Sequence, residues 1–197
     1  AAKRKFPELI THCDAVQGFL KVPFQVRSLQ ADLLSISGHK VHGVKGVGAL
    51  YQKNGIHLHP TFHGGSQERG LRPGTENVPA IAAFGAAVQT YGSTVRERYQ
   101  AVTEKKAYLL ERLQELPNCK IHSVEDASPY IISFSLRPYR SEILLHFLEK
   151  REIFVSSGSA CSKGKNSGVP VLFGATDAEA DSILRVSLSA ETPNTAL

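Results

Sequence analysis

The chain of 197 residues contains no methionine and no tryptophan, and it begins at an alanine. A chain that lacks an initiating methionine is expected to be cut, processed or partial. No run of eighteen apolar residues occurs, and no charged-then-apolar leader stands at the amino end. The sequence therefore predicts neither a membrane span nor an export signal.

Cysteine is scarce as well. The three cysteines Cys13, Cys119 and Cys161 form no CxxC pair, and an odd number of thiols cannot all pair with one another. Disulfides accumulate in oxidising compartments, so their absence is typical of a reducing one. We expect the protein in the cytoplasm, with an organelle matrix as the alternative.

The composition is that of an ordinary globular chain, with 42% hydrophobic and 21% charged residues. The net charge of +5 is modest, and the lysines and arginines are scattered rather than gathered along one helix. This distribution favours small anionic ligands over nucleic acid, and we expect neither a nucleic-acid partner nor a membrane. The sequence predicts no metal site.

A lysine follows the first strongly apolar stretch. Residues 31–36 predict a short buried strand, which places Lys40 at its carboxyl end, where open α/β sheets bind their ligands. Partial burial disfavours the charged amine and makes it a nucleophile toward a carbonyl such as an aldehyde cofactor. The alternative is a lysine that merely begins a surface loop.

An aspartate occupies a similar position upstream. Residues 8–12 predict another strand, and Asp14 follows it. A carboxylate there could hold a cationic ring nitrogen, or it could cap the next turn, as aspartate often does. Further along, the glycine-rich residues 43–51 predict a tight turn that leads into a strand.

Residues 59–77 form a segment too long and too glycine-rich for a simple connection. The backbone NH groups, Arg72 and the hydroxyl of Thr75 predict an anion-binding nest. Equally, Thr75 or Asn77 could cap the helix that begins at residue 78.

The remainder of the chain first becomes helical and then alternates strand with helix. Apolar residues at spacings of three, four and seven predict a helix from 78 to about 116, with breaks at Gly85 or Gly92. From about residue 93 the pattern predicts a small α+β unit. The expected strands are 120–122, 130–136, 153–155 and 185–189, and the expected helices are 141–151 and 176–184.

A loop of small residues at 156–168 carries a single thiol, Cys161. Lys163 and Lys165 would favour its thiolate, and a flexible loop would allow the sulfur to visit two places. The alternative is an incidental surface thiol.

Arg185 opens an apolar strand, which is a costly position for a guanidinium without a partner. A substrate carboxylate could bind it in a bidentate manner. An ion pair with Asp181 or Glu179 explains the position equally well.

Taken together, five motifs resemble the cysteine desulfurases, which are pyridoxal-phosphate enzymes of the class V aminotransferase group. The motifs are HCDAVQ at 12–17, SISGHK at 35–40, HGGSQERGLRPGTEN at 63–77, SSGSAC at 156–161 and RVSL at 185–188. The SSGSAC form is similar to the branch with a long, mobile cysteine loop, which serves iron–sulfur cluster assembly and related sulfur delivery.

The resemblance implies an α/β fold, the aspartate-aminotransferase-like fold type I of pyridoxal-phosphate-dependent transferases. Residues 1–92 would be the carboxyl-terminal part of the cofactor-binding large domain. Residues 93–197 would be the small α+β domain with the mobile cysteine loop.

The resemblance also implies roles toward pyridoxal 5′-phosphate. Lys40 would carry the Schiff base and later act on the proton at Cα of the substrate. Asp14 would pair with the pyridinium nitrogen, Gln17 would bind the ring hydroxyl, and Ser37 and His39 would hold the phosphate.

The remaining implied roles concern the substrate and the partners. Arg185 would bind the carboxylate of L-cysteine, and Cys161 would take the sulfur as a persulfide and leave L-alanine. Thr75 would reach the phosphate of the other subunit, which implies a homodimer. A sulfur acceptor or scaffold protein would complete the partners.

The chain also departs from the family, because about the first half of the large domain is missing. It lacks the phosphate-cupping loop, the histidine that stacks on the ring and the asparagine near the substrate carboxylate. The alternatives are a selenocysteine lyase-type enzyme on the same scaffold, or a non-catalytic half-chain that acts as a partner subunit of a desulfurase.

Overall fold

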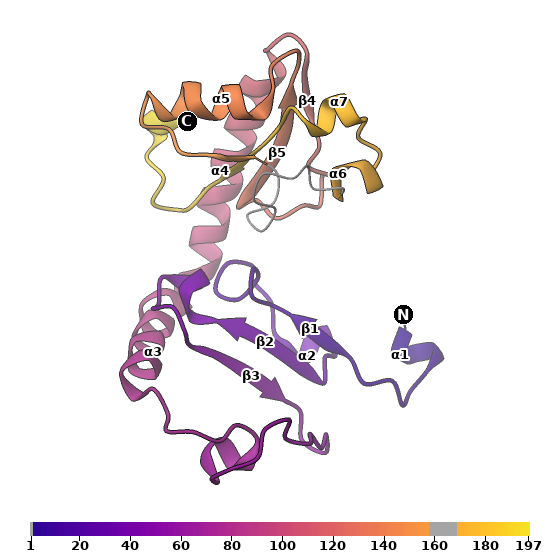
Figure 1. Ribbon diagram of the computed structural model, residues 1–197, viewed down its shortest axis with the longest axis vertical. Helices are drawn as coiled ribbons and strands as arrows, with labels where there is room; N and C mark the ends of the chain where they lie inside the picture. Colours follow the sequence, from indigo (N-terminus) through magenta and orange to yellow (C-terminus); the bar gives the residue numbers. More distant parts are fainter. Residues whose placement is uncertain (1, 158–168) are drawn as a thin grey trace. The chain divides into compact units, whose positions relative to one another are not determined.

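The computed structural model describes residues 2–157 and 169–197 (Figure 1). The chain divides into two compact units, a first unit of Ala1–Arg96 and a second unit of Glu97–Leu197. Each unit carries its own sheet. In the described part of the chain, no helix combines the length and the apolar character needed to cross a membrane.

The first unit is built on a three-stranded sheet with the order β1-β2-β3. Strands β1 (His12–Asp14) and β2 (Leu33–Ser37) are parallel, and β3 (Gly48–Gln52) runs antiparallel to β2. Parallel strands end at the same edge of a sheet, so the residues after β1 and after β2 are neighbours (Figure 1).

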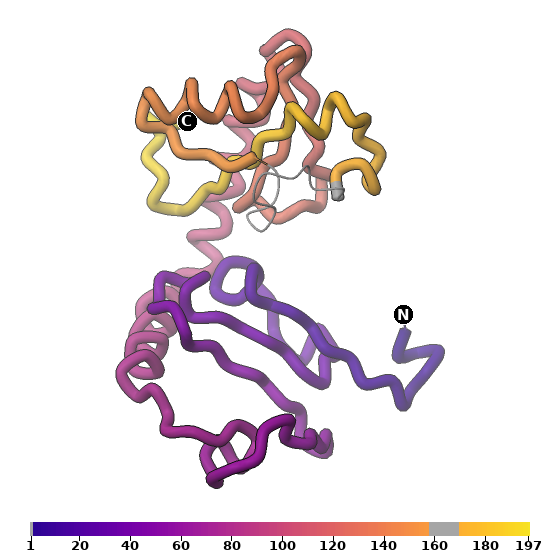
Figure 2. Tube along the Cα trace, viewed as in Figure 1, coloured from indigo at the N-terminus to yellow at the C-terminus, as the bar shows by residue number. Residues whose placement is uncertain are grey.

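Short helices and one longer helix complete the first unit. The 3-10 helix η1 (Gly38–Val41) follows β2 without an intervening loop and contacts α3 (Val78–Gly92). Figure 2 traces the path of the chain, coloured by residue number. The other helices are α1 (Ala2–Lys5), α2 (Val26–Leu29) and η2 (Gln67–Gly70).

Close packing at the end of β2 requires a glycine. A Cβ atom on Gly38 would lie 2.9 Å from Cγ1 of Val47 and 3.3 Å from Cγ of Phe84, a buried residue of α3. Any side chain would push η1 away from α3. At the start of α3, the Asn77 side chain accepts a hydrogen bond from the Ala80 amide at 3.2 Å, so Asn77 rather than Thr75 caps this helix.

A buried carboxylate ties the outer parts of the first unit together. Asp32 is only 3% exposed, and it accepts hydrogen bonds from the amide of Thr11 at 2.9 Å and from its hydroxyl at 3.1 Å. Lys3 of α1 forms an ion pair with the same carboxylate, and Lys53 lies 3.6 Å away, just beyond β3. Asp32 therefore joins the chain before β1, the start of β2 and the end of β3.

The second unit is built on a four-stranded antiparallel sheet with the order β4-β5-β7-β6. Its core combines Val102, Ile132 and Leu184, which are 1% exposed or less, with the partly buried Leu144 and Leu148. The elements are α4 (Val95–Gln114), β4 (Cys119–Ile121), β5 (Ile131–Leu136), α5 (Ser141–Glu149), β6 (Ser156–Ser157), α6 (Val169–Leu172), α7 (Asp177–Ala180), β7 (Ile183–Ser187) and η3 (Asn194–Ala196).

The structure corrects two boundaries in the second unit. The strand expected at 153–155 is wrong, because pairing with β7 begins only at Ser156, opposite Arg185. The helix expected to reach residue 184 ends at Ala180, because Ile183 and Leu184 enter the sheet as buried residues of β7. The capping box that starts this helix is confirmed, with Thr176 and Glu179 bonded to each other's backbone. The predicted break after Gly92 is also confirmed.

We predict that Ile132→Ala lowers the free energy of unfolding by about 2–5 kcal/mol, because it opens a cavity beneath a side chain that is fully buried. Chemical denaturation measures the change. Ile143→Ala on α5 is the matched control, because Ile143 is 58% exposed and its truncation should cost about 0.5 kcal/mol or less. Equal losses from both variants would contradict the assigned core.

We also predict that Asp32 makes the fold sensitive to acid. The bonds from Lys3 and then from the Thr11 amide hold the pKa of Asp32 well below its ordinary value. A lowered pKa stabilises the fold above the ordinary value of about 4, and that stabilisation is lost as the pH falls further. Denaturant midpoints between about pH 5 and pH 2 should therefore fall less steeply in Asp32→Asn, whereas the exposed control Asp126→Asn should keep the full slope.

Candidate functional site

Five of the candidate residues lie at one edge of the sheet in the first unit. Asp14 ends β1, Ser37 ends β2, and His39 and Lys40 belong to η1 directly after it. Gln17 lies in the helical turn that follows β1, where the amides of residues 18 and 19 donate to the carbonyl of Ala15. The parallel pairing of β1 with β2 brings these residues together, as the strand-end interpretation of the sequence predicts.

Ser37 and His39 are directly linked. The Ser37 hydroxyl oxygen lies 2.8 Å from Nδ1 of His39, and the histidine is exposed. Bonding at Nδ1 leaves Nε2 on the outer side of the ring. With a neutral imidazole the pair offers an anion one donor, which is Nε2–H when the hydroxyl donates to Nδ1, or the hydroxyl when Nδ1–H donates to it.

Lys40 is half-buried, and within residues 2–157 and 169–197 no carboxylate forms an ion pair with it. A second lysine lies within electrostatic reach: burial, and then the charge of Lys40, lower the pKa of Lys21. The Lys21 ammonium donates to the side-chain oxygen of Gln17 at 3.3 Å. Two amines at one edge favour a ligand with negative charge.

Sequence reasoning missed Lys21. Its spacing of four residues from Gln17 is a weak signal, because a turn and not a regular helix joins the two residues, and Leu20 between them has a left-handed φ of 54°. The sequence offers that turn only as the alternative role of Asp14, which does not indicate that Lys21 contacts Gln17.

Asp14 caps the turn that follows β1. Its Oδ1 accepts a hydrogen bond from the Val16 amide at 3.0 Å, which is the turn-capping alternative. The carboxylate is exposed, and its second oxygen remains available to a cationic group. Beside it, Nε2 of His12 lies 2.6 Å from the hydroxyl of Ser35, the residue paired with Asp14 in β2.

In the second unit, Arg185 has an unsatisfied donor. It lies in β7 between Ser133 and Ser156, and its Nη2 donates to the Ser156 hydroxyl at 3.1 Å. Its buried Nε has no acceptor in the part of the chain that the structure describes. A buried donor without a partner is costly, and a carboxylate bound side-on would satisfy it.

The expected alternative for Arg185, an ion pair with Asp181 or Glu179, is wrong. Asp181 pairs with Arg140 at 2.8 Å, and Glu179 pairs with Lys120 at 2.8 Å. The bonds from Lys120 and from the Thr176 amide lower the pKa of Glu179 to about 2. Both carboxylates are therefore already engaged away from Arg185.

Two candidates lie apart from these groups. Thr75 is exposed in the loop before α3. In contrast, η1 contacts α3 at Phe84, which lies about 9 Å along the helix axis from Val78, the first residue of the helix. Arg72 does not join Thr75 in a nest, because it donates to the Pro73 carbonyl at 2.6 Å and lies 5.3 Å from the ring centre of Phe62. Cys161 lies outside the described residues.

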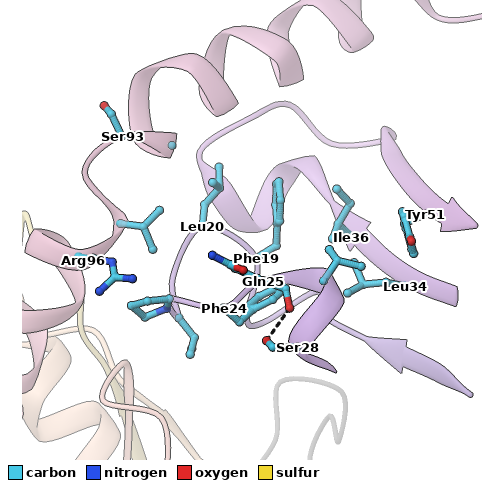
Figure 3. A pocket seen from close by; sticks show the side chains of 15 residues that line it. Phe19, Leu20, Phe24, Gln25, Ser28, Leu34, Ile36, Tyr51, Ser93 and Arg96 are labelled. Atoms are coloured by element: carbon cyan, nitrogen blue, oxygen red, sulfur yellow. Dashed lines mark hydrogen bonds between the residues drawn. The ribbon is translucent and has the colours of Figure 1, made fainter. Parts of the chain in front are cut away.

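An apolar pocket in the first unit is a different feature. It has a volume of about 680 Å³ and is lined mainly by apolar side chains, among them Phe19, Phe24, Leu34 and Ile36 (Figure 3). Successive strand residues point to opposite faces, so Leu34 and Ile36 face this pocket while Ser35 and Ser37 face the other side of the sheet. The candidate site is therefore not this pocket but the polar edge of the sheet, which carries Asp14, Gln17, Ser37, His39 and Lys40.

The residues at the polar edge fit pyridoxal phosphate. A half-buried amine without a carboxylate partner suits an aldehyde, the Ser37–His39 pair suits a phosphate, and the free oxygen of Asp14 suits a protonated ring nitrogen. Over the described residues, no group of three or more His, Cys, Asp or Glu side chains is arranged to hold a metal ion.

Comparisons with known proteins agree with this chemistry. The chain is 36% identical over 193 residues to a NifS/IcsS protein homolog of Lactobacillus delbrueckii subsp. bulgaricus, a match that covers 96% of this chain and 50% of that protein. It is 37% identical over 186 residues to cysteine desulfurase IscS of Clostridium botulinum, covering 91% of this chain and 47% of the relative. The chain thus spans about half the length of the relatives it matches.

A solved structure and a family model identify the fold and the family of the chain. The X-ray structure of a NifS-like protein from Rickettsia africae ESF-5 superposes with a TM-score of 0.88 at 32% identity, over 98% of this chain and 52% of that one. This likeness confirms the expected α/β fold of type I pyridoxal-phosphate-dependent transferases. The family model described as aminotransferase class-V matches residues 1–195. The chain therefore belongs to the class-V aminotransferases, a family of pyridoxal-phosphate-dependent proteins.

Proposed function

We propose that this chain acts in a cysteine desulfurase that converts L-cysteine to L-alanine and transfers the sulfur to Cys161 as a persulfide. The observation that carries the proposal is the gathering of Asp14, Gln17, Ser37 and Lys40 at one edge of the sheet. Cysteine desulfurases among the relatives share more than a third of their matched residues with the chain. Residues 1–92 then belong to the cofactor-binding large domain and residues 93–197 to the small domain.

The residues of the first unit bind and orient the cofactor. Lys40 would link to it covalently, Ser37 and His39 would bind its phosphate, Asp14 would accept a hydrogen bond from its ring nitrogen, and Gln17 would bind its ring hydroxyl. Pyridoxal phosphate supplies an electron sink for the carbanion formed at Cα of the substrate. The amine of Lys40 would take the proton from Cα of the substrate.

The residues of the second unit handle the substrate. Arg185 binds the carboxylate of L-cysteine through the Nε that the described residues leave unsatisfied. The Cys161 thiolate attacks the substrate sulfur, so that a sulfur–sulfur bond forms as the carbon–sulfur bond breaks. The electron pair of the broken bond stays with the carbon, which is protonated and leaves as L-alanine.

The persulfide then passes to an acceptor or scaffold protein, and we propose iron–sulfur cluster assembly as the pathway that it serves. Thr75 lies away from the Lys40 group in its own subunit, and we propose that it completes the phosphate site of a second copy in a homodimer. The cytoplasm is the compartment proposed for this reaction.

We predict that Lys40→Ala, made in the full-length protein, abolishes the covalent link to pyridoxal phosphate and lowers alanine formation at least about 100-fold. Visible absorption of the bound cofactor and mass spectrometry after borohydride reduction measure the link. Lys150→Ala, at an exposed lysine of the second unit, is the control and should keep both. A link that persists in Lys40→Ala would contradict the role of this lysine.

We predict that Cys161→Ser retains the cofactor but forms no persulfide, because a hydroxyl cannot carry the transferred sulfur. Mass spectrometry of residues 158–168 after incubation with L-cysteine detects the added sulfur. Cys119→Ser is the matched control, because the Cys119 thiol is partly buried and burial raises its pKa, which disfavours the thiolate. Alanine formation at full rate in Cys161→Ser would overturn the role of Cys161. A non-catalytic half-chain would form no alanine in any variant.

A further inference from the structure

The helical turn after β1 holds a lysine–glutamine pair that the proposed roles do not use. The amides of residues 21 and 22 both donate to the carbonyl of Gly18, and residues 18 and 19 donate to Ala15. Leu20 has a left-handed φ of 54°, so the turn that joins Gln17 to Lys21 is irregular rather than a continuous helix. Their side chains meet, with Nζ of Lys21 3.3 Å from Oε1 of Gln17.

The chemistry of the two groups fixes the orientation of the amide. The nitrogen and oxygen of a glutamine side chain are assigned from their partners, and an ammonium has hydrogens to donate but no lone pair to accept with. The atom that faces Lys21 must therefore be the carbonyl oxygen of Gln17. Its NH2 group is left on the other side as a donor.

The pair belongs to the same edge as Lys40. The pKa of Lys21 is lowered by its burial and then by the positive charge of Lys40, so the two amines lie within electrostatic range of each other. Gln17 itself is exposed, so its NH2 group can reach a ligand. Lys21 thus contacts Gln17 and lies within electrostatic range of the residue proposed to hold the cofactor.

We propose that Lys21 is a positioning residue that locks the Gln17 amide with its NH2 group toward the cofactor, so that Gln17 donates a hydrogen bond to the ring hydroxyl oxygen. This inference rests on the proposed function, because it takes pyridoxal phosphate as the ligand. An ionised ring hydroxyl has only lone pairs to offer, and a donor held in place stabilises it without the cost of reorienting a free amide.

The test is a double-mutant cycle on the full-length protein. Lys21→Met removes the ammonium but keeps the length of the side chain, and Gln17→Met removes the amide. The equilibrium dissociation constant for pyridoxal phosphate and the visible absorption spectrum of the complex are measured for the wild type, both single variants and the double variant. Thermal unfolding of the cofactor-free proteins shows whether each variant is folded.

We expect each single variant to bind pyridoxal phosphate about fivefold more weakly, because that loss of affinity corresponds to the net free energy of one hydrogen bond. If Lys21 acts through Gln17, the double variant binds no more weakly than Gln17→Met alone. Lys21→Arg keeps a donor and should restore wild-type affinity and absorption. Arg27→Met removes an exposed positive charge from the same unit and should change neither.

The outcomes separate the two proposals. Wild-type protein that fails to bind pyridoxal phosphate overturns the proposed function and this inference with it. Wild-type binding with losses that multiply in the double variant, or with a Lys21→Met spectrum and affinity equal to wild type, overturns the positioning role alone. Losses in Lys21→Arg equal to those in Lys21→Met would also overturn it.

Discussion

The parallel pairing of β1 with β2 is the constraint on which the candidate site depends. His12, Cys13 and Asp14 lie beside Leu33, Leu34 and Ser35, so the chain leaves both strands at the same edge. The candidate residues lie directly after the strands, in the first turn after β1 and in the 3-10 helix after β2. Side chains separated by more than twenty residues are therefore held together by backbone hydrogen bonds.

Charge explains why this edge suits an anion. Lys21 and Lys40 lie near one another, and Asp14, the carboxylate at the same strand ends, already accepts a hydrogen bond from its own turn. In the second unit the acidic residues around Arg185 are engaged by Arg140 and Lys120. Each unit thus keeps cationic groups that neighbouring carboxylates do not neutralise, which fits a phosphate in one case and a carboxylate in the other.

Local patterns in the sequence predicted helices and strands better than they predicted which distant side chains interact. The apolar run before Lys40, the capping box at Thr176 and the break at Gly92 are short-range signals, and the structure confirms all three. The sequence could not decide whether Arg185 pairs with Asp181, because Arg140, the residue just before α5, pairs with that carboxylate instead. Lys21 was missed for a related reason, since its importance depends on Lys40 nineteen residues away.

Strand β2 serves two surfaces at once. Its even-numbered residues Leu34 and Ile36 line the apolar pocket, and its odd-numbered residues Ser35 and Ser37 bond to His12 and His39 on the other side. Because strand side chains alternate, the loss or gain of one residue would exchange the two sets and turn hydroxyls toward the apolar pocket. This stretch of the chain is thus far more tolerant of substitution than of any change in its length.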